Sequence, residues 1–147
     1  MMLPLEERLA LQDLMVDYCY AVDNLADLAP LLDLFTPDAV LDFSHIGLSV
    51  MRGRGEWEPF FANVFAGMSH HTHYISNFRV ESYSGEQAVM RAYVQGFGRA
   101  KDGNSVHVHV RYRMECVKVA GVWKCSRYDN LPGMPMPGSL AEIHADH

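Results

Sequence analysis

The 147-residue sequence has few basic residues, few cysteines and no long hydrophobic segment. Its 12 Lys and Arg against 18 Asp and Glu give a net charge of -6, and no basic cluster is present. Such a chain lacks the positive surface that nucleic-acid binding requires. The first residues offer neither a basic n-region nor an apolar stretch, so the sequence predicts no signal peptide and no membrane span. We therefore expect a cytoplasmic protein with no nucleic-acid or membrane partner.

The three cysteines, Cys19, Cys116 and Cys125, are an odd number and lie far apart, each within an apolar run. This pattern favours reduced packing residues over a disulfide framework or a zinc site. The sequence also lacks the glycine-rich phosphate-binding motifs, the C-x-x-C pair and the H-E-x-x-H zinc motif. We therefore expect any chemistry to come from side chains alone, with neither a cofactor nor a metal.

The length and the 49% hydrophobic content are typical of one globular domain. We assign that domain to residues 1–131. Residues 132–147 form a tail rich in proline and methionine, which we expect to be extended. The tail is predicted to pack over a pocket or over a neighbouring subunit.

Hydrophobic periodicity predicts helices followed by long strands. Apolar residues recur every three or four positions in the helical segments and alternate in the strand segments. Short turns at residues 84–85, 101–104 and 120–121 favour antiparallel pairing, and two glycines inside one strand, Gly96 and Gly98, would let the sheet bend. The predicted fold is α+β, with helices on one face of a bent sheet that encloses a cavity. The expected helices are 5–24, 25–35 and 56–68, and the expected strands are 39–43, 71–82, 87–100, 105–119 and 122–131.

Two positions could carry acid-base chemistry. Asp23 follows an almost wholly apolar helical turn, where it either starts a solvated turn or lies buried beside a partner. His71 and His73 share one face of a strand and could be packed histidines, metal ligands or a general base held by Asp23. Alternation places His107 and His109 on the opposite face from the core, as outer-face or subunit-interface residues, with entry into the cavity as the weaker alternative.

Aromatic residues could form either the core or a cavity wall, and periodicity does not separate these two roles. The residues concerned are Phe43, Trp57, Phe60, Phe61, Phe65, Tyr93 and Phe97.

The helix-borne Asp23, the segment His73-Tyr74-Ile75-Ser76-Asn77 and the segment Gly121-Val122-Trp123-Lys124 resemble the nuclear transport factor 2-like superfamily, and within it the SnoaL-like branch. The resemblance covers about residues 5–131. It implies a cone in which a strongly curved antiparallel or mixed sheet and N-terminal helices close an internal cavity. It also implies a homo-oligomer, a dimer or a trimer.

Scytalone dehydratase, hexachlorocyclohexane dehydrochlorinase and bile acid 7α-dehydratase of that superfamily use an Asp-His pair. The resemblance places the general base on His73, the carboxylate that orients it on Asp23, and an assisting tyrosine on Tyr18. It implies a cofactor-free lyase, a dehydratase or dehydrohalogenase, for a hydrophobic cyclic substrate of steroid or polyketide type. The expected substrate-binding residues are Tyr20, Phe43, Trp57, Phe61, Phe65, Tyr93, Tyr112 and Arg127.

Two alternatives stay open. An isomerase or cyclase would use the same pair without a leaving-group acid. A noncatalytic module that binds a small molecule or assembles with a partner, such as the small subunit of a ring-hydroxylating dioxygenase, would share the fold.

Overall fold

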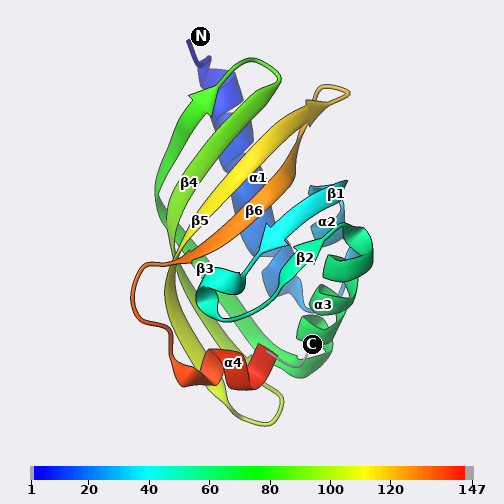
Figure 1. Cartoon of the computed structure of the whole chain (residues 1–147), viewed down its shortest axis with the longest axis vertical. Coiled ribbons are helices and arrows are strands. Elements are labelled where there is room, and N and C mark those ends of the chain that lie inside the picture. The colour runs from blue at the N-terminus through cyan, green and yellow to red at the C-terminus, as the bar shows by residue number, and fades with distance from the viewer. Residues whose placement is uncertain (1, 145–147) are drawn as a thin grey trace.

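The computed structural model describes residues 2–144, which form helices, one sheet and a C-terminal helix (Figure 1). The N-terminus lies at one end of the long axis, and the C-terminal helix lies at the other end. The elements in chain order are α1 (Leu5–Asn24), α2 (Ala29–Leu32), β1 (Phe35–Asp42), the 3-10 helix η1 (Ser44–Ile46), β2 (Val50–Arg52), α3 (Arg54–Gly67), β3 (Met68–Tyr83), β4 (Gln87–Ala100), β5 (Ser105–Val119), β6 (Val122–Pro132) and α4 (Gly138–His144).

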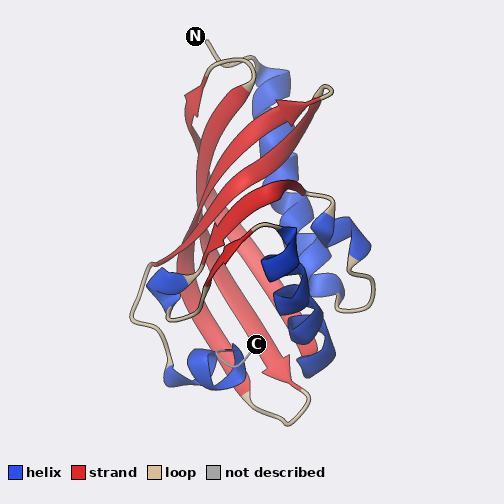
Figure 2. Ribbon diagram, turned by 45° about the vertical axis from the view of Figure 1, so that its right-hand side comes forward, coloured by secondary structure: helices blue, strands red, loops and turns tan. Residues whose placement is uncertain are grey.

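The sheet has six strands in the order β2-β1-β6-β5-β4-β3. Only the β1–β6 pair is parallel among these strands, so the sheet is mixed, and it is open. Its long strands bend along their length, and α1, α2 and α3 lie together on one side of them, at the right in Figure 2. This is the α+β cone that the sequence predicts, and the curvature creates room for a cavity between the sheet and the helices.

Helix α1 has the bounds that the sequence predicts. Its buried positions, which include Leu11, Met15 and Tyr18, recur at three and four residues and face the sheet. The helix ends at Asn24 and is followed by Leu25, whose φ of 59° is the left-handed conformation that closes many helices. Neither α1 nor another helix within residues 2–144 combines the length and the hydrophobicity needed to cross a membrane.

The segment after α1 differs from the prediction. The expected helix 25–35 is reduced to the single turn of α2, because β1 begins at Phe35 and continues through Pro37. Proline has no amide hydrogen, and the pairing of β1 with β6 is interrupted between Phe35 and Val40, where Pro37 needs no ladder bond. The short β2 and η1 were not predicted.

The tail also differs from the prediction. Instead of staying extended, it forms α4 after Pro137, and Leu140 of this helix is buried. Residues 145–147 of the predicted tail lie outside the described residues. Packing of the tail over a neighbouring subunit stays a prediction.

All three cysteines are buried and free. Burial raises the pKa of Cys19 to about 12 and the pKa of Cys116 to about 12, so both thiols stay protonated at neutral pH. The expectation of reduced packing residues is confirmed for the described chain.

Candidate functional site

A cavity of about 80 Å³ lies between the concave face of the sheet and the helices. Its wall is mainly apolar, with a few polar groups, which is the usual composition of a small-molecule site. Residues from α1, α3, the middle strands and α4 contribute to it. The lining consists of Tyr18, Val22, Phe43, Ile46, Leu48, Phe60, Phe61, Val64, His71, His73, Gly96, Phe97, Gly98, Val106, Val108, Val110, Tyr112, Asn130, Leu140 and His144.

Asp23 and His73 form a hydrogen-bonded pair at the edge of this cavity. His73 Nδ1 lies 2.6 Å from Asp23 Oδ1, and the backbone N–H of His73 donates to Asp23 Oδ2 at 3.0 Å. The side chains are 22% and 13% exposed for Asp23 and His73. Because an ionised carboxylate only accepts hydrogen bonds, Nδ1 of His73 donates to Asp23, and in the neutral form of the ring Nε2 is left as a base. The last turn of α1 thus fixes the orientation of an imidazole near the start of β3.

His71 is fixed by the residue that precedes Asp23. Its Nδ1 lies 2.9 Å from the carbonyl oxygen of Val22, one of the helix-end carbonyls that lack a partner within the helix. The rings of His71 and His73 meet edge to face, with 4.9 Å between their centroids. Burial, and next the charge of His73, lower the pKa of His71 to about 4, so this ring is neutral at pH 7.

The lowered pKa of His71 predicts a loss of stability in acid. The unfolded chain, with an ordinary pKa of 6.5, binds the proton first, so stability is fully present above pH 6.5 and falls toward pH 4. We expect His71 to account for at most about 3 kcal/mol of this loss. The measurement is the free energy of urea unfolding from pH 8 to pH 4.

The matched variant is His71→Asn, which can still donate to the Val22 carbonyl but does not titrate. We expect its unfolding free energy to depend less on pH between 6.5 and 4. An identical pH dependence in both proteins would contradict a buried neutral His71.

The same residues also offer donor atoms for a cation. Asp23, His71 and His73 each present one possible ligand atom, and these atoms lie within 4.8 Å of one another. The sequence predicted no metal because it shows no carboxylate near the histidines, whereas the fold brings Asp23 beside them. A metal at Nδ1 of His73 would displace the proton that this nitrogen donates to Asp23, and a metal at Nε2 would leave that hydrogen bond in place.

Gly96 and Gly98 make room for the two imidazoles. In the β3–β4 ladder Gly96 pairs with His73 and Gly98 pairs with His71, so each ring lies over a glycine. A Cβ at Gly96 would lie 3.2 Å from His73 Cδ2, and one at Gly98 would lie 3.3 Å from His71 Cδ2. These glycines were predicted to bend the sheet, and the structure adds this steric role.

We expect Gly96→Ala to lower kcat/KM by about 10- to 100-fold while the protein stays folded, because the methyl group would displace the His73 ring. Gly98→Ala is the matched control. Its closest contact is the flexible end of Met68, at 2.6 Å, which can move away. The measurement is turnover together with the unfolding temperature. Equal effects of the two alanines would argue against a special requirement at His73.

Three buried tyrosines form a cluster near the Asp23–His73 pair, which we call the dyad. Tyr18, Tyr112 and Tyr128 meet edge to face, with centroids 5.0 to 5.6 Å apart. Burial raises the pKa of each phenol well above its ordinary value. The hydroxyl groups therefore stay protonated, as donors of hydrogen bonds. Tyr18 and Tyr112 line the cavity, as predicted, whereas Tyr128 was not predicted.

Two tyrosines of the predicted substrate set lie away from the cavity. Tyr20 is 77% exposed, because it sits on the outer side of α1. Tyr93 is 46% exposed on the outer face of β4, where the Arg111 guanidinium lies 4.3 Å from its ring centroid. Tyr93 points outward because side chains alternate along a strand and its neighbours Ala92 and Val94 point inward.

Trp57 and Phe65 are buried, but neither lines the cavity. The Trp57 Nε1–H donates to the carbonyl of Ala39 at 3.1 Å, and its ring packs 5.3 Å from that of Phe35. Both residues belong to the core between α3 and the sheet. Phe43 and Phe61 do line the cavity, so the expected aromatic set divides between the two roles.

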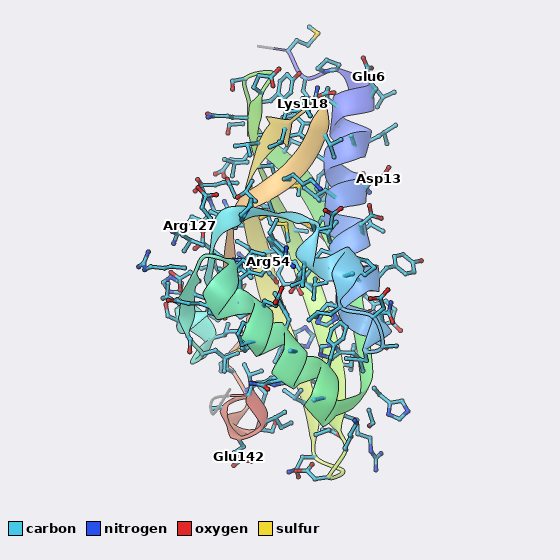
Figure 3. The ribbon with its side chains drawn as sticks, turned by 90° about the vertical axis from the view of Figure 1, so that its right-hand side faces the viewer. Glu6, Asp13, Arg54, Lys118, Arg127 and Glu142 are labelled. Atoms are coloured by element: carbon cyan, nitrogen blue, oxygen red, sulfur yellow. The ribbon has the colours of Figure 1, made fainter. Side chains whose placement is uncertain are left out.

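Arg127, the remaining predicted substrate residue, is turned outward by a β-bulge. Cys125 pairs with Cys116, but Arg127 pairs with Glu115, so Ser126 is an extra residue that reverses the alternation. Arg127 therefore binds Asp42 and Asp129 in place of a ligand. Figure 3 shows it on the side of the sheet opposite α1.

The same bulge brings inward a residue that the sequence interpretation missed. After Ser126 the inward positions are Tyr128 and Asn130, and Asn130 reaches the cavity wall. His144 of α4 also lines the cavity and was not predicted, since it lies beyond the recognised pattern. His107 and His109 are exposed on the outer face, as expected, and His107 stacks on Phe97 with 4.0 Å between centroids.

Comparison with known proteins adds a family and several relatives. The model of the SnoaL-like domain matches residues 4–129. A candidate aromatic ring hydroxylase from Novosphingobium aromaticivorans is 48% identical, with a TM-score of 0.92, over 97% of this chain and 99% of that one. A hexachlorocyclohexane dehydrochlorinase of type 2 is 25% identical, with a TM-score of 0.77, over 91% of each chain. A candidate scytalone dehydratase from N. aromaticivorans shares the fold at 23% identity, with a TM-score of 0.80, over 88% of this chain and 86% of that one. None of the curated proteins matches this chain.

Proposed function

The chain belongs to the SnoaL-like domain family, and from this membership and the site we propose that it is a cofactor-free lyase for a hydrophobic cyclic substrate. The observation that carries the proposal is the hydrogen bond between Asp23 and His73 at the edge of an apolar cavity. A dehydratase or a dehydrohalogenase would each use this arrangement. The likeness to a dehydrochlorinase supports the reaction class.

In the proposed mechanism His73 Nε2 removes a proton from a carbon atom of the substrate. The imidazolium that forms is stabilised by Asp23, which also fixes the tautomer through Nδ1. The electron pair of the broken C–H bond forms a double bond, and the leaving group departs from the adjacent carbon. Asp23 is a positioning residue in this scheme, because it acts through the imidazole.

Tyr18 is the proposed proton donor for a departing hydroxide. Its hydroxyl is buried in the cavity wall, and burial keeps its pKa high. It therefore donates a hydrogen bond to developing negative charge, and would transfer the proton only as the oxygen leaves. The ring is held by Tyr128 and Tyr112, so its position is fixed before the substrate binds.

The cavity volume constrains the proposal. The cavity of about 80 Å³ is partly open and is smaller than an engineered protein cavity of roughly 150 Å³ that binds benzene. A cyclic substrate would therefore extend through the open side of the cavity or displace part of its wall. Helix α4 is the segment best suited to move, because it is short and contributes Leu140 and His144 to the wall.

The test is a screen of cyclic alcohols and cyclic halides in deuterated water with the full chain. Formation of an alkene supports the lyase. Deuterium exchange or rearrangement without loss of a leaving group would favour an isomerase or a cyclase. If none of these reactions is detected, the result contradicts catalysis by the Asp23–His73 pair. The screen is repeated with a chelator, because activity that requires an added divalent cation would replace the dyad mechanism with a metal site at Asp23, His71 and His73.

A second candidate is an assembly or binding module of a ring-hydroxylating system. It is favoured by the 48% identity to a protein named as a candidate aromatic ring hydroxylase. A hydroxylation needs an oxidant, and under this second candidate function a partner protein would supply it. Co-purification with a larger oxygenase subunit, and no change of that complex in His73→Ala, would support it.

A further inference from the structure

Asn130 has an unfilled hydrogen-bonding position at the cavity wall. It lies on the inner face of β6, directly across from Tyr112 of β5, and the residue is 8% exposed. Its Nδ2 donates to the hydroxyl of Tyr128 at 3.4 Å, whereas Oδ1 has no hydrogen-bond partner within residues 2–144. A buried amide oxygen without a partner costs free energy.

A packing role does not account for this residue. Leucine has a similar shape and would fill the same place without a buried polar atom. Above Asn130 along the wall lie apolar side chains such as Val108 and Val110, which offer no donor. A molecule in the cavity can supply the donor that Oδ1 lacks.

A hydroxyl group meets the requirement of this position better than other substituents. It can donate to Oδ1 and can at the same time accept from a neighbouring tyrosine hydroxyl such as that of Tyr112. It also suits the amide in its reversed orientation, in which nitrogen would face the ligand and need an acceptor. A chlorine substituent or an unsubstituted ring has no hydrogen to donate and would leave the amide oxygen unpaired.

We propose that Asn130 is a specificity-determining residue that binds a hydroxyl group of the ligand, so that the cavity selects a cyclic alcohol or a phenol over a cyclic halide or hydrocarbon of the same size. This inference rests on the proposed lyase function, and it adds that the substrate of this lyase is an alcohol. Asn130 itself transfers no proton in this scheme.

The experiment compares three rings of similar size, phenol, benzene and chlorobenzene, titrated into the full chain and followed by NMR. We expect phenol to bind about 5- to 150-fold more tightly than the other two, the range for an unpaired buried polar group. In Asn130→Leu this preference should disappear, while benzene binds as well as before or better. Equal binding of the three rings by the wild type, or no binding at all, would overturn the proposal, as would a preference that survives in Asn130→Leu.

Three further variants make the result specific. Asn63→Leu changes the same residue type on the exposed side of α3 and should leave the phenol preference intact. Asn130→Ser keeps a polar group and should retain part of the preference, which covers the case in which the leucine variant does not fold. His73→Ala should bind phenol with the same preference, so failure of the hydroxyl subsite is distinguished from failure of the proposed lyase chemistry.

Discussion

Replacing His73 by alanine is expected to lower kcat by about 100- to 10,000-fold, because it removes the imidazole that the Asp23 carboxylate orients as the base. Asp23→Asn should cause a loss within the same range. Its amide can donate as well as accept, so it no longer holds the tautomer with the proton on Nδ1. The measurement is turnover of a cyclic substrate, with the nitrogen-15 NMR signals of the imidazole reporting the tautomer.

The double variant sharpens this test. Because Asp23 acts through His73, Asp23→Asn combined with His73→Ala should be no slower than His73→Ala alone. His70→Ala is the matched control, since His70 is on the same strand but is exposed. Losses that multiply in the double variant would show that Asp23 acts independently, and full turnover by His73→Ala would remove this mechanism.

Trp57→Ala is expected to destabilise the protein by about 3–5 kcal/mol, a large part of the stability of a domain of this size. Trp57 is 0% exposed, packs against Phe35 and donates its indole N–H to the Ala39 carbonyl. Removing the ring leaves a cavity in the core that the neighbouring elements can fill only in part. The measurement is urea unfolding followed by circular dichroism.

Trp57→Phe separates packing from hydrogen bonding. The Ala39 carbonyl keeps a second donor, the N–H of Gly53 at 2.9 Å, so we expect a cost of only about 1–2 kcal/mol. Ligand affinity should be unchanged in Trp57→Phe, because the ring does not line the cavity. A change in affinity without a change in stability would restore the sequence interpretation of Trp57 as a substrate contact.

Local patterns predicted the elements whose periodicity is long and unbroken. The bounds of α1, β4 and β5 agree with the prediction, because each has many turns or ladder pairs with one consistent apolar face. The C-terminal helix was missed because its apolar residues, Leu140 and Ile143, are too few to show a period. The prediction of an extended tail rested on its prolines, which precede the helix.

Register shifts explain the errors in the candidate site. The resemblance to the family placed Arg127 among the substrate-binding residues, but one extra residue at Ser126 reverses the strand alternation and turns Arg127 outward. The same shift turned Asn130 inward. A bulge depends on how two strands pair, and the sequence of one strand carries little signal of it.

The sequence by itself determined the α+β class and the positions of the long helix and strands, and its resemblance to the family named Asp23 and His73 as candidates. It did so because helical and strand periods are local properties of the chain. Only the tertiary structure decided that Asp23 contacts His73 at 2.6 Å, that glycines lie under both imidazoles, and that Asn130 faces the cavity while Tyr20, Tyr93 and Arg127 do not. These facts depend on contacts between residues far apart in the chain, which are fixed by packing and strand register.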